Sequence, residues 1–524
     1  MTRTRAGLLS ASAMLALVVL AWPSVNAADL AGKAELAVAD ANSEPLYSGV
    51  FACLGCHSAG EQSPYVESLA LVRMDEVRVW HEQDKHSLAY CVLSGELGRQ
   101  MSERLGVNVT TAKECLACHA PRHEQRSADS NAPPNYKLSE GVSCEDCHGG
   151  SRGWHRLHVL KDQWRELSPE QKQSHGMNDL RDPLTRANVC LDCHVGNAKE
   201  GQIVTHAMYA AGHPPLASID IVAYANDMPR HWRTPGEQAE RGAARVETDP
   251  IADARMAMAG HLAAGERSLR LATRAYEGLP DFANFDCDAC HHELSSPSWR
   301  QARLTRGMPG RPMFREWPLQ MAALTSELVA ADGSNDTVRG SLNEISGALQ
   351  SRPFGGDGKA SAAAALALAD MWARQAEKLA AAGQQPSDSK RWTDAILERA
   401  LDSQQPPDYD TARTLAWLLK YAVSTPSDEA NTEAEVAWNE LDSQLGLSIP
   451  HGSASSVAEV CDLGGEDVDN GPALQGTNRR TQPAATRPAT VSQTLPQTLR
   501  ARANYDPVKF QQAIQRFADS ARTR

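Results

Sequence analysis

One short pattern recurs five times in this chain and constrains its fold more than any other feature. Two cysteines stand two residues apart, and a histidine follows the second one at once. The five copies are Cys53-Leu-Gly-Cys56-His57, Cys115-Leu-Ala-Cys118-His119, Cys144-Glu-Asp-Cys147-His148, Cys190-Leu-Asp-Cys193-His194 and Cys287-Asp-Ala-Cys290-His291. The chain has 12 cysteines and 17 histidines in 524 residues. Random placement would give on the order of 0.01 such motifs, so the repetition is not accidental.

The histidine directly after the second cysteine indicates which cofactor the motif binds. Two thiols at this separation reach the two vinyl groups of one haem and become thioethers, and the next residue then meets the iron from one face. A zinc site needs four tetrahedral ligands and does not require histidine at that position every time. A redox dithiol would not repeat five times with it. The sequence therefore predicts five covalently bound haems c, attached through the ten motif cysteines. Their iron ligands on this side would be His57, His119, His148, His194 and His291.

Two cysteines, Cys91 and Cys461, lie outside the motifs. A disulfide between them is one interpretation, and two unpaired structural thiols is the other. Because they lie far apart in the sequence and in different regions, the sequence favours two unpaired thiols.

The second axial ligand of each iron separates two broad functions. An iron with two protein ligands passes electrons, whereas an open position can bind and transform a small molecule. None of the five motifs ends in lysine instead of histidine. This argues against one known kind of catalytic haem, in which lysine binds the iron and the opposite position is open. Twelve histidines outside the motifs could supply the second ligands: His81, His86, His123, His155, His158, His175, His206, His213, His231, His261, His292 and His451.

Residues 50 to about 235 resemble a multihaem cytochrome c family. It is typified by the tetrahaem carrier that takes electrons from hydroxylamine oxidoreductase. The landmarks are Trp80, the "DKH" that ends at His86, the "GVSCEDCHG" of Gly141 to Gly149, a histidine about ten residues later, and a fourth motif. The segments "HAMYAAGHPPL" and "MPRHW" are similar to a larger branch of that superfamily, in which a fifth haem is added.

The resemblance implies a set of distal ligands. His86 and His158 match positions that supply them in the family, and His206 and His213 are the next candidates. His231 and His292 are expected to be hydrogen-bonding residues instead. In the tetrahaem family the second haem has a vacant position, so the haem on Cys115 and Cys118 is expected to be open here. The one close candidate, His123, follows Pro121, and from a neighbouring turn it could hardly reach the opposite face of the same haem.

The chain begins with a segment typical of export. Arg3 and Arg5 form a basic start, an apolar run extends from Leu8 to Leu20, and small residues lead to a cleavage site after Ala27. The run is shorter than the ~20 residues of a spanning helix. We expect a removed signal peptide, a periplasmic location and no membrane span afterwards.

The fold class predicted is mainly α, with a loop-rich multihaem region followed by a small helical bundle. Three- and four-residue apolar spacing predicts helices at 359–383, 408–423 and 431–445. Asp506-Pro507 resembles a helix start, and Phe510, Ile514 and Phe517 form a stripe expected to fold back on the bundle. The predicted parts are a signal peptide at 1–27, a pentahaem domain at 28–318, a helical domain at 319–461, a flexible linker at 462–503 and an amphipathic helix at 504–524.

These observations favour an exported cytochrome that relays electrons between redox partner proteins. One alternative is a haem enzyme that acts on a small nitrogen or sulfur oxide at an open iron, and another is a scaffold whose helical half docks a separate oxidase or reductase. The net charge of −13 disfavours nucleic acid as a partner.

Overall fold

The computed structural model is mainly helical, as predicted. It describes residues 47–62, 70–123, 137–242, 251–273, 275–276, 279–295, 298, 311–329, 335–352, 356–381, 388–423, 432–447 and 495–522. The predicted signal peptide, most of the predicted linker, His451 and Cys461 lie outside these ranges. Pro45–Arg524 forms one compact unit.

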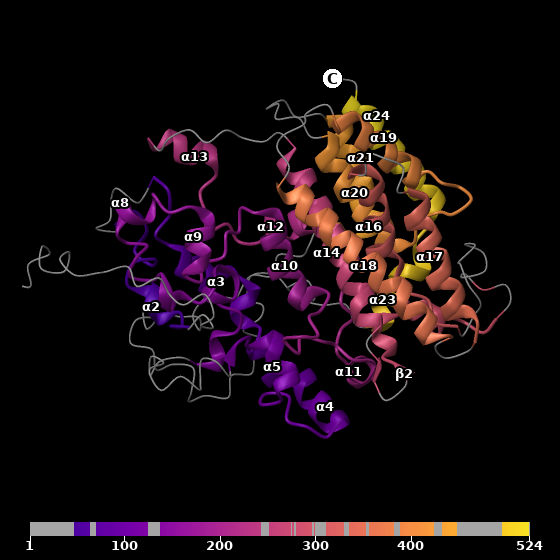
Figure 1. Ribbon diagram of the computed structural model, residues 1–524, viewed down its shortest axis with the longest axis horizontal. Helices are drawn as coiled ribbons and strands as arrows, with labels where there is room; N and C mark the ends of the chain where they lie inside the picture. The colour runs from indigo at the N-terminus through magenta and orange to yellow at the C-terminus, as the bar shows by residue number, and fades with distance from the viewer. Residues whose placement is uncertain are drawn as a thin grey trace, which may run out of the picture. The chain divides into compact units, whose positions relative to one another are not determined.

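The first half of this unit is built from short helices joined by loops (Figure 1). Its α-helices are α2 (Phe51–Leu54), α3 (Glu76–Gln83), α4 (Glu96–Leu105), α5 (Lys113–His119), α7 (Cys144–His148), α8 (Lys161–Trp164), α9 (Pro169–Ser174), α10 (Pro183–His194), α11 (His206–Ala211), α12 (Ile221–Asp227) and α13 (Pro235–Glu240). Its 3₁₀ turns are η1 (Gly60–Gln62), η3 (Lys85–Leu88), η4 (Cys91–Ser94), η5 (Leu138–Glu140), η6 (Ser151–Gly153), η7 (Phe282–Asn284) and η8 (Cys287–Ala289). Short elements of this kind suit a region whose interior is to be filled by large cofactors rather than by side chains.

The second half consists of longer helices around a shared apolar core. They are α14 (Ala252–Thr273), α16 (Glu316–Val329), α17 (Asn335–Gln350), α18 (Gly358–Ala381), α19 (Asp388–Ala400), α20 (Tyr409–Val423) and α21 (Thr432–Leu445). The helices predicted at 359–383, 408–423 and 431–445 correspond to α18, α20 and α21 within the described residues.

Helix α14 lies along α16 and α18 at the centre of this core (Figure 1). Gly265 permits the close approach, because a Cβ atom there would lie 2.5 Å from the Cβ of Ala322 and 2.9 Å from the ring of Trp372. Since α14 belongs to the predicted pentahaem domain and the other two helices to the bundle, the two regions share one core. The boundary at residue 318 stays a prediction.

The last helix, α24 (Pro507–Arg522), packs on α21, α20 and α19. Phe510, Ile514 and Phe517 are buried, which confirms that this stripe folds back on the bundle. Asp506 caps the helix by accepting hydrogen bonds from the backbone N–H of Val508 at 3.0 Å and of Lys509 at 3.3 Å.

Helix α23 (Leu495–Asn504) corrects one expectation. Its residues were predicted to be the end of a flexible linker, on composition alone. Composition could not show that Arg502 forms buried ion pairs with acidic side chains from other parts of the chain, and this tertiary anchoring outweighs the weak local preference.

Two other features are minor. The strands β1 (Ala275–Tyr276) and β2 (Leu279–Pro280) form an antiparallel pair in which Ala275 lies opposite Pro280.

Among the described helices, none combines the length and the apolar character that a membrane crossing requires.

The state of Cys91 differs from the favoured expectation. This buried residue is disulfide-bonded rather than an unpaired thiol. Sequence separation argued against pairing, but folding brings segments that are distant in the sequence together.

Candidate functional site

The five motifs stand on short helical turns that place their three functional side chains together. In α5, α7 and α10 the two cysteines and the histidine occupy the last turn of the helix. Side chains at positions i, i+3 and i+4 lie on one helical face, so both thiols and the imidazole can meet the same ligand. The motifs at Cys53 and Cys287 begin in α2 and η8 and continue into turns. We number the candidate haem sites 1 to 5 in the order of their motifs.

Acidic side chains fix the start of several of these turns. Asp182 caps α10 by accepting a hydrogen bond from the N–H of Thr185 at 2.7 Å, and Asp286 caps η8 by accepting one from Asp288 at 3.2 Å. In α7 the carboxylate of Asp146 accepts from the N–H of Ser143 at 2.6 Å. These caps satisfy backbone donors that a short helix leaves free, so the third, fourth and fifth motifs are held by local hydrogen bonds.

Every motif histidine faces the ring of a second histidine. The ring centroids are separated by 6.2 to 6.4 Å in all five cases. The pairs are His57 with His158 at site 1, His119 with His213 at site 2, His148 with His231 at site 3, His194 with His86 at site 4, and His291 with His206 at site 5.

This separation fits a single metal ion between the two rings. A bond from an imidazole nitrogen to a metal is about 2 Å long, so two such bonds on opposite sides put the nitrogens ~4 Å apart and the ring centroids roughly 6 Å apart. The five gaps therefore have the width that an iron with two axial histidines requires.

Hydrogen bonds to Nδ1 leave Nε2 available in most of these rings. Nδ1 of His57 contacts Glu76 at 2.9 Å, and Nδ1 of His86 contacts Asp84 at 2.9 Å. Four other rings use Nδ1 to donate to a backbone carbonyl: His119 to Ala89 at 2.5 Å, His158 to His155 at 2.5 Å, His213 to Pro214 at 2.8 Å, and His231 to Pro229 at 3.3 Å. Partners of this kind fix the tautomer and orientation of metal-binding histidines.

Burial favours the neutral, ligating form of several rings. It lowers the pKa of His148 to about 4, and it does the same for His194 and for His213. His57 is different: burial alone would lower its pKa, but the hydrogen bond and charge of Glu76 outweigh burial and raise it. A carboxylate that stabilises positive charge on an imidazole also makes it a stronger electron donor to a metal.

The ten motif cysteines are all free thiols in the structure, as attachment to haem requires. Thiols of different motifs also lie side by side. Cys53 of site 1 is hydrogen-bonded to Cys144 of site 3, and Cys118 of site 2 is hydrogen-bonded to Cys193 of site 4. Sites 1 and 3 are therefore neighbours, and so are sites 2 and 4, although their motifs are spread along the chain.

The structure brings all four predicted distal candidates to a motif histidine. His158 lies at site 1, His213 at site 2, His86 at site 4 and His206 at site 5. Other histidines are engaged elsewhere: Nε2 of His155 lies 3.0 Å from the carbonyl oxygen of Ala52.

Two expectations about the sixth ligands stay predictions, and the positions of the rings bear on both. His231 is expected to be a hydrogen-bonding residue, and its Nδ1 does donate to the carbonyl of Pro229 at 3.3 Å, but its ring also faces His148 with a centroid separation of 6.4 Å. The haem at site 2 was expected to have an open position, but His213 faces His119 there. The expectation of a vacant position rested on the family resemblance and on the lack of a suitable histidine close to the second motif in the sequence. The sequence did contain a hint of the fifth histidine: five irons need five second ligands, and the predicted set of distal histidines has only four members.

His292 agrees with its expectation. Its Nδ1 lies 2.9 Å from the carbonyl oxygen of Glu293, although it directly follows the motif histidine of site 5.

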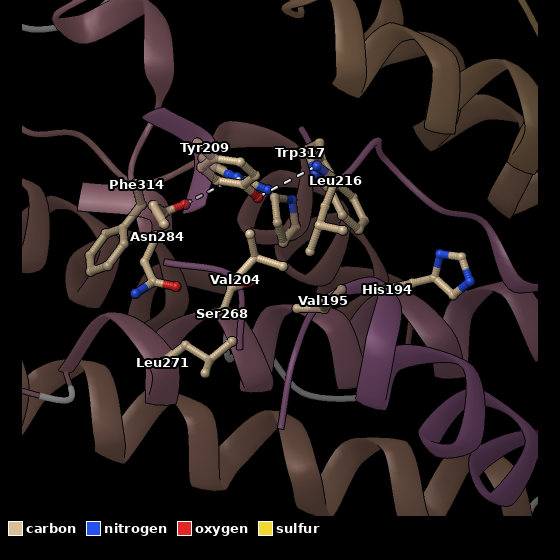
Figure 2. Close-up of a pocket in the computed structure, with 13 residues that line it drawn as sticks. His194, Val195, Val204, Tyr209, Leu216, Ser268, Leu271, Asn284, Phe314 and Trp317 are labelled. Atoms are coloured by element: carbon tan, nitrogen blue, oxygen red, sulfur yellow. Dashed lines mark hydrogen bonds between the residues drawn. The ribbon is translucent and has the colours of Figure 1, made fainter. Parts of the chain in front are cut away.

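A pocket lies between α10 and the segment around the fifth motif (Figure 2). His194 lines one end of it, and Tyr209 and Phe314 lie toward the other. Arg315 also lines the pocket and donates hydrogen bonds to the phenol oxygen of Tyr209 at 3.2 Å and to the carbonyl of Ala283 at 3.0 Å. A guanidinium held in this way beside apolar walls suits a carboxylate-bearing ligand such as haem.

Comparison with known proteins agrees with this chemistry. Residues 52–149 match the family model described as cytochrome c554 and c-prime. This range contains the motifs of sites 1, 2 and 3, and it supports a haem-binding electron-transfer cytochrome of the multihaem c type. No curated protein and no solved structure matches the chain.

Proposed function

We propose that this protein is an exported pentahaem cytochrome c in which each iron has two axial histidines and which relays electrons between redox partner proteins. The observation that carries the proposal is the set of five facing histidine pairs, all with nearly the same ring separation. Haem attached at the motif cysteines would supply the one-electron chemistry. The chain supplies attachment, axial ligands and a protein interior around them.

The neighbouring thiols suggest an order for the relay. The pair Cys53 and Cys144 links sites 1 and 3, and the pair Cys118 and Cys193 links sites 2 and 4. Helices α7 and α10, which carry the third and fourth motifs, pack against each other, and this contact supports a link between sites 3 and 4. Helix α11 and its C-terminal end supply ligands to both site 5 and site 2. We infer the order 1, 3, 4, 2, 5.

The donor and acceptor are proposed only by class. Two histidine ligands favour low reduction potentials relative to a histidine and methionine pair, so respiratory redox proteins are the expected partners. The resemblance to the carrier that serves hydroxylamine oxidoreductase makes a multihaem oxidoreductase a reasonable donor. The enzyme alternative depends on an open iron, and the five pairs described above favour none.

The proposal is tested on the purified protein by counting haems and their spin states. The pyridine haemochrome assay and the intact mass should give five covalent haems per chain, and the electron paramagnetic resonance spectrum of the ferric protein should contain low-spin signals only. Fewer than five haems, or a stoichiometric high-spin signal in the native protein, would contradict it.

A further inference from the structure

A buried cluster of charges connects the fifth motif to the C-terminal region. Arg502 on α23 contacts Asp286 at 3.2 Å and Asp288 at 3.5 Å through Nη1, and it contacts Asp410 through Nη2. Asp286 and Asp288 flank Cys287, the first attachment residue of site 5. Asp410 lies in the first turn of α20. One guanidinium therefore joins three separate parts of the chain.

The cluster is shielded from solvent. The side chains of Arg502, Asp286, Asp288 and Asp410 are exposed by 13%, 9%, 11% and 8%. Charges interact strongly when water is excluded, and a single buried guanidinium here faces three carboxylates. The nearby Arg315 contributes a second positive charge, directed to Tyr209 and Ala283.

The charges in this cluster act electrostatically on Cys287, the first attachment residue of site 5. Burial raises the pKa of the Cys287 thiol, while Arg315 and Arg502 act against that rise. Burial, followed by the charge of Asp286, raises the pKa of Asp288 to about 7.

We propose that Arg502 is a positioning residue for the haem of site 5: it holds the attachment segment against α20 and α23, and its buried charge keeps the reduction potential of that site above the value the three carboxylates would impose. The inference rests on the proposed function, because it requires a haem on Cys287 and Cys290. Reduction adds negative charge, so a nearby cation favours the reduced state and nearby carboxylates oppose it.

Two variants with opposite effects separate an electrostatic role from simple structural damage. Arg502→Gln removes the cation and should lower the midpoint potential of one component in a redox titration of the full-length protein. Asp410→Asn removes a carboxylate of the cluster that lies outside the motif, and it should raise the potential of the same component. We expect at least a tenfold change in the one-electron equilibrium for Arg502→Gln, which corresponds to ~59 mV.

Three further variants complete the design. The site 5 component is identified as the one missing from a variant that carries both Cys287→Ser and Cys290→Ser. Arg516→Gln removes an exposed arginine that pairs with Glu440 on the neighbouring helices, and it should leave all five potentials unchanged. Arg502→Lys keeps the charge and should retain a potential close to the parent value even if Arg502→Gln fails to accumulate.

The possible outcomes are distinguishable. Opposite shifts confined to site 5 support the proposal. Unchanged potentials with full haem content, equal signs for Arg502→Gln and Asp410→Asn, or the same shift in Arg516→Gln would overturn it. A parent protein without haem on Cys287 and Cys290, as shown by peptide mass, would instead contradict the proposed function.

Discussion

His119 and His213 face each other with their ring centroids 6.4 Å apart and their ring planes at 78°. His119 belongs to the second motif, whereas His213 directly follows α11 and Gly212. The carbonyl of Pro214 holds Nδ1 of His213, so Nε2 is left for the gap between the rings. In the proposed haem site this pair would supply a ligand on each face of the iron.

Replacing His213 with alanine should open the second site. The variant should keep five covalent haems, because attachment depends on Cys115 and Cys118, but one haem should become high-spin and should bind carbon monoxide when reduced. Electron paramagnetic resonance and optical spectra measure both changes. His123→Ala is the matched control and should leave the spectra unchanged. A variant of His213 that remains fully low-spin would show that another residue is the ligand.

The angles between the paired rings predict two kinds of low-spin signal. The ring planes lie at 20° at site 1 and 25° at site 5, but at 78°, 75° and 87° at sites 2, 3 and 4. Parallel imidazoles separate the energies of the iron d orbitals, whereas perpendicular imidazoles leave two of them nearly equal. We expect two rhombic signals and three strongly anisotropic ones in the ferric spectrum. Five signals of one kind would contradict these orientations.

Glu76 should set the reduction potential of the first site. Its carboxylate contacts Nδ1 of His57 at 2.9 Å, and its other oxygen accepts backbone N–H groups of Arg73 at 2.7 Å and Met74 at 3.0 Å. Glu76→Gln can keep the backbone contacts but turns an amide N–H₂ toward Nδ1. The imidazole then donates less electron density, which favours reduction. The potential of one haem should rise by tens of millivolts.

The control for this prediction is Glu82→Gln on the same helix, whose side chain pairs with Arg78. It should leave the potential unchanged. A fall in potential in Glu76→Gln would show that the carboxylate does not act through His57.

Glu145, the first of the two residues between Cys144 and Cys147 of the third motif, should contribute to stability. Its buried carboxylate accepts hydrogen bonds from the backbone N–H groups of Ser48, Gly49 and Ser151, each at 2.8 Å. Glu145→Gln would aim an amide donor at one of these N–H groups. An unsatisfied buried donor costs about 1–3 kcal/mol, so the midpoint of chemical unfolding should fall.

The exposed Glu170 provides the comparison. Glu170→Gln should change the free energy of unfolding by less than about 0.5 kcal/mol. Equal effects of the two substitutions would show that the buried contacts of Glu145 contribute no special stability.

The disulfide of Cys91 is open to a direct test. With ten cysteines assigned to haem, Cys461 is the one other cysteine in the sequence, and we expect it to be the partner. Peptide mapping without reduction should recover one linked peptide that separates on reduction. Cys91→Ser should lower the free energy of unfolding by about 2–4 kcal/mol. A free thiol at Cys461 in the native protein would rule the pairing out.

The sequence by itself determined what depends on neighbouring residues. The two thiols and the histidine of each motif act together because their spacing alone puts them on one side of a turn, so no knowledge of the fold was needed to predict the haem sites. The helix stripe at Phe510, Ile514 and Phe517 was equally readable, because burial of an apolar face follows helical periodicity.

Only the tertiary structure decided which histidine meets which motif. A second axial ligand can come from any part of the chain, since the iron fixes only its distance and direction. The ring of His86 therefore faces His194 of the fourth motif rather than the first motif, which it follows in the sequence, and His231 faces His148 although nothing local in the sequence predicted that pairing. The same holds for Arg502: its charge was visible in the sequence, but its three carboxylate partners come together only when α20, α23 and the fifth motif pack against one another.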